Sequence, residues 1–372
     1  MGIQKIILNI ILNIEKIFLS LLKMKKNRIT FMSLDSNVLS MDFELIYNAL
    51  DHEKYDVKLC LIHYHKNLLG QFQYFLNCFK QMYYVYTSAF IILNNNNYVV
   101  SKFKREDVQV FQIWHACGAI KKFGNVINRK YAISNYDYVL STSTYWKKPY
   151  SEAFGVHEEN VLPLGMPRND ELFNEQLKDK YRNDIYMKYP QIRNKKIILY
   201  APTFRGNIYK GFSTVDFDAL TLMNQLGEDY VLLYKFHPLL GDVQLPQHER
   251  IINMNHENTH QLFCVCDYMI SDYSSIVFDY FILQKPFLFY VPDLKEYESD
   301  LGVFVDIETL GLPIAYTMNE VYEWIQDNHF DKNIIQNCFN TFFDYQDEYS
   351  TKRVVDFIDE KMAIDKSSAV EN

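Results

Sequence analysis

The sequence predicts an α/β protein made of two doubly wound domains that face a cleft. Short apolar runs typical of buried strands alternate with segments of helical periodicity along most of the chain. A polar, helical stretch at 171–193 interrupts this alternation, which then starts again. The 372 residues, of which 48% are hydrophobic, are enough for about two domains with cores of their own. Strands that alternate with helices form parallel sheets with crossover helices, so we expect both halves to be doubly wound.

The expected elements follow one another in the order strand, helix, strand. In the first half the expected strands are 28–33, 55–62, 83–86, 89–93, 108–114, 138–142 and 161–165. The clearest helices there are 42–50 and 68–82. The second half has expected strands at 196–201, 230–236, 250–253, 268–270 and 286–291, and a helical end at 321–362. We therefore divide the chain into a helix (1–27), two domains (28–180 and 181–345) and a C-terminal helix and tail (346–372).

Composition excludes several classes of function. The formal net charge of −8 argues against nucleic-acid binding, which needs a basic face to neutralise phosphates. The six cysteines are scattered and form no CxxC pair, so we expect reduced, buried thiols in a cytosolic compartment. The chain has no HExxH motif and no Walker A loop, and we expect neither a metal ion nor a cofactor.

The N-terminus predicts an amphipathic helix with a narrow polar stripe. The stripe recurs every three or four residues and consists of Lys5, Asn9, Asn13, Lys16, Ser20 and Lys23, and the rest of the cylinder is mostly Ile, Leu and Phe. Three more basic residues follow: Lys25, Lys26 and Arg28. We expect this helix to lie in the inner-leaflet interface, with the basic cluster on anionic headgroups, as a peripheral protein on the cytoplasmic face of the cell membrane. A terminal helix packed on the core and a transmembrane anchor remain alternatives.

The stretch 270–281 has the pattern of a strand, a turn rich in hydroxyls and a helix. An apolar run ends at Ile270, Asp272, Ser274 and Ser275 occupy the turn, and residues at helical spacing follow. A helix start presents unpaired N–H groups and the positive end of a dipole, and both favour a phosphate. An ordinary capped turn between strand and helix explains the same residues.

Polar residues also follow the other expected strands. His115 directly follows 108–114, and its imidazole can take a proton from an attacking hydroxyl. Lys121 and Lys122 stand a few residues further on, where they could meet an acidic substrate. A turn at 165–170 presents Arg168 and Asp170. Arg168 either holds a phosphate or pairs with Asp170.

Two strand ends of the second half carry similar chemistry. Thr203 and Arg205 follow 196–201. Lys235 and His237 end the run 230–236, and the two-residue period of a strand places both on one side. A cation and an imidazole on one face suit a diphosphate.

These motifs together resemble the CDP-glycerol glycerophosphotransferase family of teichoic-acid synthesis. The resemblance covers roughly 28–345 and rests on the order and spacing of the segments Gln112–Lys121, Gly165–Asp170, Leu199–Arg205, Lys235–Pro238 and Ser271–Tyr280, extended by Lys285–Tyr290 and Asp293–Tyr297. It implies a GT-B-like fold, in which a first Rossmann-like domain binds the acceptor and a second binds the CDP-polyol donor. It also implies a membrane-associated, metal-independent transferase. The donor would be CDP-glycerol or CDP-ribitol, and the acceptor a hydroxyl of an undecaprenyl-diphosphate-linked glycan.

The resemblance assigns roles to individual residues. His115 is the candidate general base, and His237, Ser274 and Ser275 would hold the donor diphosphate. Arg205 and Lys235 are candidates for stabilising the charge of the phosphates, because both lie at strand ends. Asp279 either orients His237, contacts donor hydroxyls or supports the helix. Asp272, Arg168, Asp170 and Thr203 are expected to support the site.

The chain departs from the longer members of this family. Where those polymerases have a Gly-Thr-Pro-like segment after the first His, 116–119 reads Ala-Cys-Gly-Ala. This departure favours a short member that adds the first one or few polyol phosphates. A GT-B sugar transferase of capsule synthesis and an inactive membrane scaffold are the alternatives.

Overall fold

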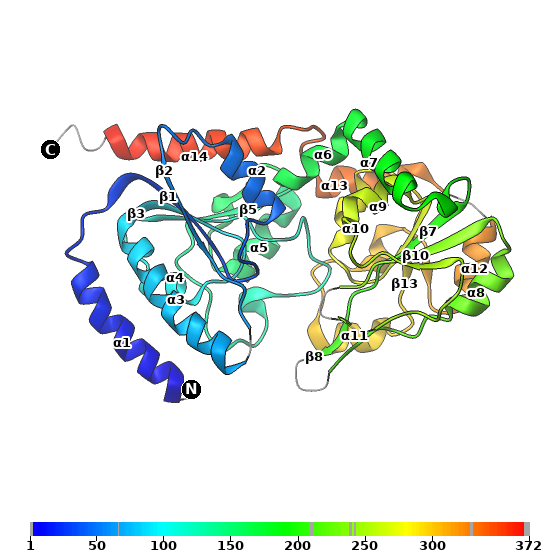
Figure 1. Cartoon of the computed structure of the whole chain (residues 1–372), viewed down its shortest axis with the longest axis horizontal. Coiled ribbons are helices and arrows are strands. Elements are labelled where there is room, and N and C mark those ends of the chain that lie inside the picture. Colours follow the sequence, from blue (N-terminus) through cyan, green and yellow to red (C-terminus); the bar gives the residue numbers. More distant parts are fainter. Residues whose placement is uncertain are drawn as a thin grey trace. The chain divides into compact units, whose positions relative to one another are not determined.

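The computed structural model describes residues 3–65, 67–207, 211–237, 240–241, 243–327 and 330–367 (Figure 1). The chain divides into two compact units. Unit 1 comprises Met1–His115, Phe123–Asp170 and Phe343–Asn372, and unit 2 comprises Ala116–Lys122 and Glu171–Phe342. A short segment of the first half, 116–122, thus belongs to unit 2, and the C-terminal end of the chain belongs to unit 1.

Unit 1 is built on a six-stranded sheet whose neighbouring strands are all parallel. The order is β2-β1-β3-β4-β5-β6, with bounds β1 Lys25–Ser33, β2 Asp56–Leu61, β3 Ser88–Leu93, β4 Gln109–Gln112, β5 Tyr138–Ser141 and β6 Val161–Pro163. The longer helices are α1 Ile3–Leu19, α2 Met41–Ala49, α3 Leu68–Thr87, α4 Tyr98–Phe103, α5 Lys147–Phe154 and α14 Ser350–Ser367. Every residue of β3 is buried, as expected for a central strand covered on both faces.

Unit 2 repeats this architecture with a second parallel sheet. The order is β11-β10-β7-β12-β13-β14, with bounds β7 Lys196–Tyr200, β10 Tyr230–Tyr234, β11 Ile251–Asn253, β12 Tyr268–Ser271, β13 Phe287–Tyr290 and β14 Ile314–Ala315. Two short strands, β8 Arg205–Asn207 and β9 Gly211–Ser213, pair antiparallel apart from this sheet. The helices are α6 Asp170–Phe173, which begins at the last residue of unit 1, α7 Glu175–Lys188, α8 Ala219–Leu226, α9 Thr259–Val265, α10 Ile276–Phe281, α11 Leu294–Leu301, α12 Met318–Asp327 and α13 Lys332–Phe342. Two parallel sheets with crossover helices confirm the predicted α/β class.

One predicted strand is wrong. Residues 83–86 belong to the last turns of α3, which runs to Thr87. Tyr and Val favour strands locally, but Cys78, Met82 and Val85 recur at helical spacing and are fully buried. Packing of that helical face outweighs the local preference.

Only the N-terminal part of the predicted polar stripe of α1 faces the body of unit 1, because Asn13, Lys16 and Ser20 are exposed. Lys5 and Asn9 hydrogen-bond to that body, and Leu12 is fully buried. The opposite face consists of exposed apolar side chains, 43–67% accessible: Ile6, Ile7, Ile10, Ile14, Ile17 and Phe18. The helix packs beside α3 (Figure 1). Among the described helices, none has the length and apolar character needed to cross a membrane.

The C-terminal helix α14 packs on unit 1 beside α2 (Figure 1). Its first turn is capped by Asp170, whose carboxylate accepts from the N–H groups of Ser350 and Thr351, each at 2.8 Å. Lys54 and Asp359 form an ion pair of 2.6 Å further along the helix. These contacts fix the end of the chain to unit 1.

Candidate functional site

The sheet of unit 2 has a topological switch point between β7 and β12. When these six strands are numbered along the chain, their order in the sheet is 3-2-1-4-5-6. The connections that follow the two central strands, β7 and β12, therefore lead to opposite sides of the sheet. Ligands of such folds bind in the crevice at the carboxyl ends of these strands. The residues after β7, β10 and β12 are therefore the candidate site of unit 2.

Hydrogen bonds between backbone groups, and one from a serine side chain, align the ends of these three strands. Ala201 N–H donates to the Ile270 carbonyl at 3.0 Å, and Lys235 N–H donates to the Tyr200 carbonyl at 2.9 Å. Ser271 Oγ donates to the Ala201 carbonyl at 2.7 Å. The loops that follow consequently start from one edge of the sheet.

Arg205 and Asp272 connect the loops after β7 and β12. One Arg205 Nη donates to Asp272 at 2.8 Å, and Thr203 N–H donates to the same carboxylate at 2.7 Å. The other side of the guanidinium binds Asp293 through two hydrogen bonds, of 2.6 and 3.1 Å. Because two carboxylates already neutralise Arg205, these contacts favour a positioning role over the predicted contact with the donor diphosphate.

The Arg205 guanidinium is also enclosed by aromatic rings. Its Cζ lies 5.0 Å from the ring centroids of Tyr273 and Tyr297, which stack on each other with centroids 3.7 Å apart. Burial raises the pKa of Asp272 to about 6, against the opposing effects of Arg205 and the Thr203 N–H. This turn is thus a buried, charged framework.

Ser274 and Ser275 lie at the start of α10, and both are partly accessible. Ser275 is the N-cap residue, and its side chain makes no capping hydrogen bond. The two serines are thus the accessible part of a turn whose Asp272 and Tyr273 are buried.

Lys121 and His237 both contact the ring of Phe204. The Lys121 ammonium lies 4.9 Å from the ring centroid, and the His237 ring centroid lies 5.1 Å from it. Burial lowers the pKa of Lys121, while Asp272 raises it. Lys121 reaches unit 2 because the backbone of its segment pairs with 302–304. The sequence placed this lysine in the first half of the chain and gave no sign of that pairing.

Lys235 lies beside the same strand end. Its ammonium donates to the Asn255 carbonyl at 2.8 Å, and burial lowers its pKa. Phe236 packs in the core, whereas Lys235 and His237 are more accessible, as the predicted alternation requires. Pro238, which completes this motif, lies outside the described residues.

Asp279 is buried in α10 behind the serines. It accepts from the Cys117 thiol at 2.8 Å, and its carboxylate lies 4.0 Å from Nε2 of His260. The other ring nitrogen of His260 lies 2.6 Å from Glu171. These contacts favour a supporting role for Asp279 that joins the segment 116–122 to α10.

In unit 1, His115 lies beyond the carboxyl end of β4. Its Nδ1 is 3.3 Å from the Asn94 carbonyl, and the ring lies against Trp114 at 3.9 Å between centroids. Trp114 has a φ of 55°, a conformation rare for non-glycine residues that turns the chain sharply at this point. His115 is exposed to solvent, and desolvation by the surrounding groups nevertheless lowers its pKa below that of a free imidazole.

Next to His115, three asparagines carry buried amide atoms with no hydrogen-bond partner among the described residues. They are Oδ1 of Asn94, both amide atoms of Asn95 and Oδ1 of Asn96. Asn94 is 3% exposed and Asn95 8%. Buried amides are normally satisfied, so this cluster is a candidate polar contact for a ligand. The run of four asparagines at 94–97 was visible in the sequence, but its burial was not.

Arg168 and Asp170 have separate partners in unit 1. Arg168 donates to Asp42 from both its backbone N–H, at 2.9 Å, and its guanidinium, at 2.8 Å. Asp170 caps α14 instead, through the N–H groups of Ser350 and Thr351. Both residues thus act in the framework of unit 1.

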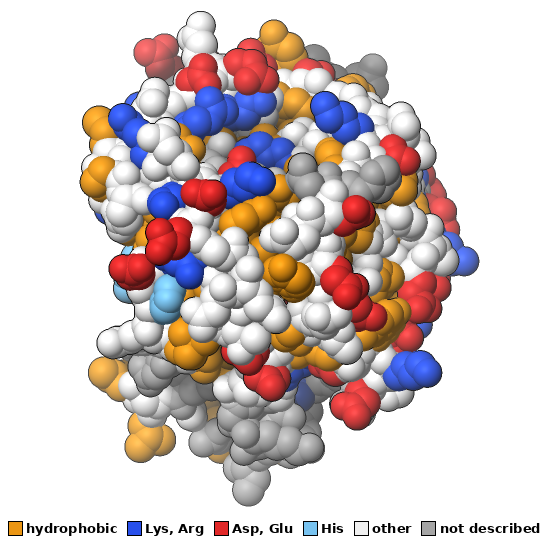
Figure 2. All heavy atoms as spheres, turned by 90° about the vertical axis from the view of Figure 1, so that its right-hand side faces the viewer, with side chains coloured by type: hydrophobic (Ala, Val, Ile, Leu, Met, Phe, Trp, Pro, Cys, Tyr) orange, Lys and Arg blue, Asp and Glu red, His pale blue; other side chains and the backbone are white. Residues whose placement is uncertain are grey.

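The six cysteines are all buried and none of them forms a disulfide, as predicted for core thiols. Within the described ranges, no group of three or more His, Cys, Asp or Glu side chains could hold a metal ion. Figure 2 shows one face of the molecule, on which acidic and basic side chains are interspersed.

Comparison with known proteins identifies the family. The sequence profile of the CDP-glycerol:poly(glycerophosphate) glycerophosphotransferase family matches residues 15–360. The chain belongs to this family. The predicted resemblance and the predicted class of enzyme, a glycerophosphotransferase-type transferase, are confirmed.

Curated relatives of this family include primases and polymerases. The chain is 30% identical to the teichoic acid ribitol-phosphate primase of Bacillus spizizenii over 92% of this chain and 93% of the relative. It is 31% identical to the teichoic acid glycerol-phosphate primase of Bacillus subtilis, over 71% and 76% respectively. The fold resembles the wall teichoic acid polymerase TagF, with a TM-score of 0.75 at 21% identity over 98% of this chain and 100% of that one. The predicted GT-B-like fold is confirmed.

Proposed function

We propose that this protein transfers glycerol phosphate from CDP-glycerol to a hydroxyl of a lipid-linked glycan and releases CMP. The observation that carries the proposal is the arrangement at the switch point of unit 2. There Lys121 and His237 both contact the ring of Phe204. Ser274 and Ser275 follow β12 at the same edge of the sheet. An ammonium group, an imidazole and two accessible hydroxyls suit a diphosphate.

On the donor side, His237, Ser274, Ser275 and Lys235 are the proposed diphosphate ligands. Arg205 holds the turn in place through Asp272 and Asp293. Rigid support for such a turn matters, because phosphoryl transfer depends mainly on positioning and charge stabilisation.

On the acceptor side, His115 is the proposed general base. Its lowered pKa keeps the imidazole neutral near pH 7, which a base requires. The acceptor oxygen attacks the β-phosphorus of the donor, and its proton passes to His115. The bond between this phosphorus and the bridging oxygen breaks, and CMP leaves with the electron pair.

The same proposal includes a peripheral position on the cytoplasmic face of the membrane. The outward face of α1 carries six exposed apolar side chains, which in water would be costly. Three exposed basic residues follow the helix: Lys23, Lys25 and Lys26. Arg28, predicted to belong to this cluster, is instead 4% exposed and pairs with Asp56. An apolar helix face with basic residues beside it suits an interface with anionic lipids.

Ribitol phosphate is the second candidate for the transferred group. The similarity to a ribitol-phosphate primase over 93% of that relative favours it. The chain is also 31% identical to the teichoic acid poly(ribitol-phosphate) polymerase of the same organism, of which it spans 57%.

Calorimetric titration of the donor tests this assignment. We expect CDP-glycerol or CDP-ribitol to bind, and UDP-sugars not to bind. Replacing Ser275 by Ala should weaken donor binding about tenfold, whereas Ser299→Ala, on α11, should leave it unchanged. If a UDP-sugar binds and neither CDP-glycerol nor CDP-ribitol binds, the protein is a sugar transferase and the proposal is wrong.

A further inference from the structure

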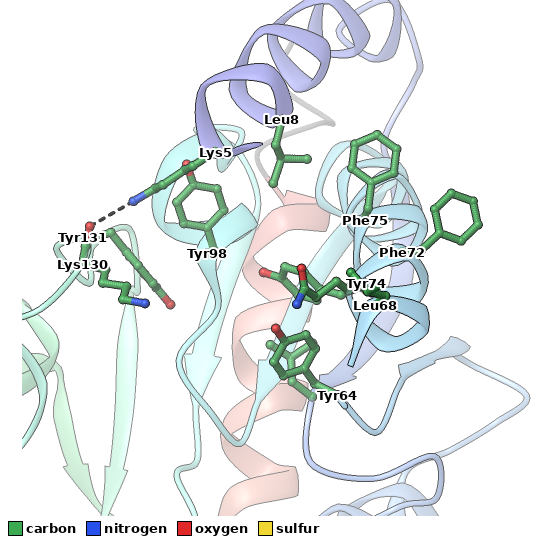
Figure 3. A pocket seen from close by; sticks show the side chains of 12 residues that line it. Lys5, Leu8, Tyr64, Leu68, Phe72, Tyr74, Phe75, Tyr98, Lys130 and Tyr131 are labelled. Carbon is green, nitrogen blue, oxygen red and sulfur yellow. Dashed lines mark hydrogen bonds between the residues drawn. The ribbon is translucent and has the colours of Figure 1, made fainter. Parts of the chain in front are cut away.

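A large cavity lies between α1, α3 and the start of α4 in unit 1 (Figure 3). Its volume is about 710 Å³, enough for a sizeable ligand. The apolar and aromatic lining comprises Leu8, Leu34, Tyr64, Leu68, Phe72, Tyr74, Phe75, Tyr98 and Tyr131. In Figure 3, Leu8 reaches from α1 into the space between Tyr98 and the aromatic residues of α3.

The cavity occupies the place where a doubly wound sheet binds its ligand. β1 and β3 are neighbours in the order β2-β1-β3-β4-β5-β6, and the chain leaves them in opposite directions. Leu34 directly follows β1, and Tyr98 begins α4 after β3. The cavity thus lies at the switch point of unit 1, on the edge of the sheet where the active-site His115 also lies.

The cavity is continuous with the exposed apolar surface of α3. Two of its lining residues, Leu68 and Phe72, are also 84% and 57% exposed. Leu69 and Leu76 extend this surface along α3, at 65% and 51% exposed. An apolar cavity that opens onto an apolar surface is suited to a hydrocarbon chain that enters from a membrane.

Two cationic side chains lie at one end of the cavity. Lys5 Nζ donates to the Lys130 carbonyl at 2.9 Å and lies 5.2 and 5.6 Å from the ring centroids of Tyr98 and Tyr131 (Figure 3). Neither lysine is paired with a carboxylate within the described part of the chain. Ammonium groups without a carboxylate partner beside an apolar cavity complement an anionic lipid head.

Unpaired polar groups lie along the chain between the residue that contacts His115 and the first cavity residue of α4. Asn97, which caps α4, directly precedes the cavity residue Tyr98, and the Asn94 carbonyl contacts His115. The amides between them, above all that of Asn95, lack partners within the described residues. They are placed to meet the polar part of a molecule whose chain lies in the cavity.

We propose that this cavity binds the hydrocarbon chain of the lipid-linked acceptor, with Lys5 and Lys130 at its phosphate. This inference rests on the proposed function, since it identifies how the acceptor is held. Chain binding then directs the acceptor head along Asn94–Asn96 toward His115. The occupant is the acceptor lipid and not a lipid of the surrounding bilayer.

Binding of farnesyl phosphate to the full chain in detergent-free buffer tests the site directly. We expect saturable binding, weakened at least tenfold by Leu8→Trp and by Phe75→Trp, which fill the cavity. Lys130→Ala should also weaken it, whereas Met187→Trp, at an exposed position of α7, should not. Absence of saturable binding would overturn the proposal, and so would equal competition by a phosphatidylglycerol vesicle.

Kinetics separate this inference from the proposed function. With a long-chain acceptor, Leu8→Trp should raise the acceptor KM at least tenfold. With a water-soluble acceptor that lacks the chain, the same variant should match the wild type. Equal effects on both acceptors would contradict a chain site. Farnesyl phosphate binding without CMP release from either CDP-polyol would retain the chain site and reject the proposed reaction.

Discussion

The guanidinium of Arg205 donates a hydrogen bond of 2.8 Å to the buried carboxylate of Asp272. This pair joins the loops that follow β7 and β12, the two strands on either side of the switch point of unit 2. The serines that we propose as diphosphate ligands follow Asp272 by two and three residues. The pair therefore sets the position of the proposed donor site without belonging to its accessible surface.

Replacing Arg205 by Ala should destabilise the fold. The change leaves Asp272, 1% exposed, without its charged partner, and breaking a buried ion pair costs about 3–5 kcal/mol. Denaturant unfolding measures this loss. The exposed Arg193→Ala serves as the control, and adding Asp272→Asn to Arg205→Ala should restore part of the stability. A stable Arg205→Ala variant that loses only donor affinity would instead make Arg205 a direct diphosphate ligand.

His115→Ala should lower kcat/KM for CMP release by about 10²–10⁴-fold, the usual contribution of a general base. The thermal midpoint should change little, because His115 is exposed. His157→Ala, an exposed histidine of the same unit, is the matched control. Turnover of His115→Ala like that of the wild type would remove His115 as the base.

The pH profile provides a separate test of His115. Its pKa is lowered by desolvation, so the neutral, basic form persists to a lower pH than for a free imidazole. We expect kcat/KM to be level above neutral pH and to fall as the pH drops below the ordinary histidine value. A fall that begins well above neutral pH would contradict this assignment.

Glu15 should make the docking of α1 depend on pH. Burial raises its pKa from 4.5 to about 7, and one of its carboxylate oxygens has no partner among the described residues. The folded state thus favours the protonated form, so this contribution to stability is complete below about pH 4.5 and is lost as the pH rises through 7. Glu15→Gln should raise the thermal midpoint at pH 8 and not at pH 5. Glu44→Gln, on an exposed position of α2, should do neither, and an equal effect of Glu15→Gln at both pH values would contradict the prediction.

Asn95→Leu should separate stability from activity. The amide of Asn95 is buried and unpaired, so an apolar side chain of similar volume should leave the unfolding free energy unchanged or raise it. The KM for the lipid-linked acceptor should rise about tenfold, since the polar contact is lost. A destabilised variant with normal acceptor KM would show that Asn95 serves the fold.

Much of the fold could be predicted because its pattern is local. Apolar runs such as 89–93 and 196–201 are strands that lie within one residue of their expected bounds. The strand expected at 83–86 failed because burial along α3 overrides local preference. β14 is only two residues long and left no pattern to detect.

The sequence predicts which residues of the candidate site follow strands, but it does not predict which other residues they contact. His115, His237, Ser274 and Ser275 follow strands and were found for that reason. The association of 116–122 with unit 2 and the pairing of Arg205 with Asp293 join residues far apart in sequence. Periodicity carries no information on such contacts, which arise only when the chain is packed.

Mass spectrometry of the reaction product tests the central claim most directly. The full chain is incubated with a lipid-linked disaccharide and either CDP-glycerol or CDP-ribitol, and released CMP is quantified alongside the product mass. We predict equimolar CMP release and the addition of one or few glycerol phosphate units from CDP-glycerol. Addition of ribitol phosphate from CDP-ribitol, with none from CDP-glycerol, would show that the transferred polyol is ribitol. No CMP release from either donor would contradict the account.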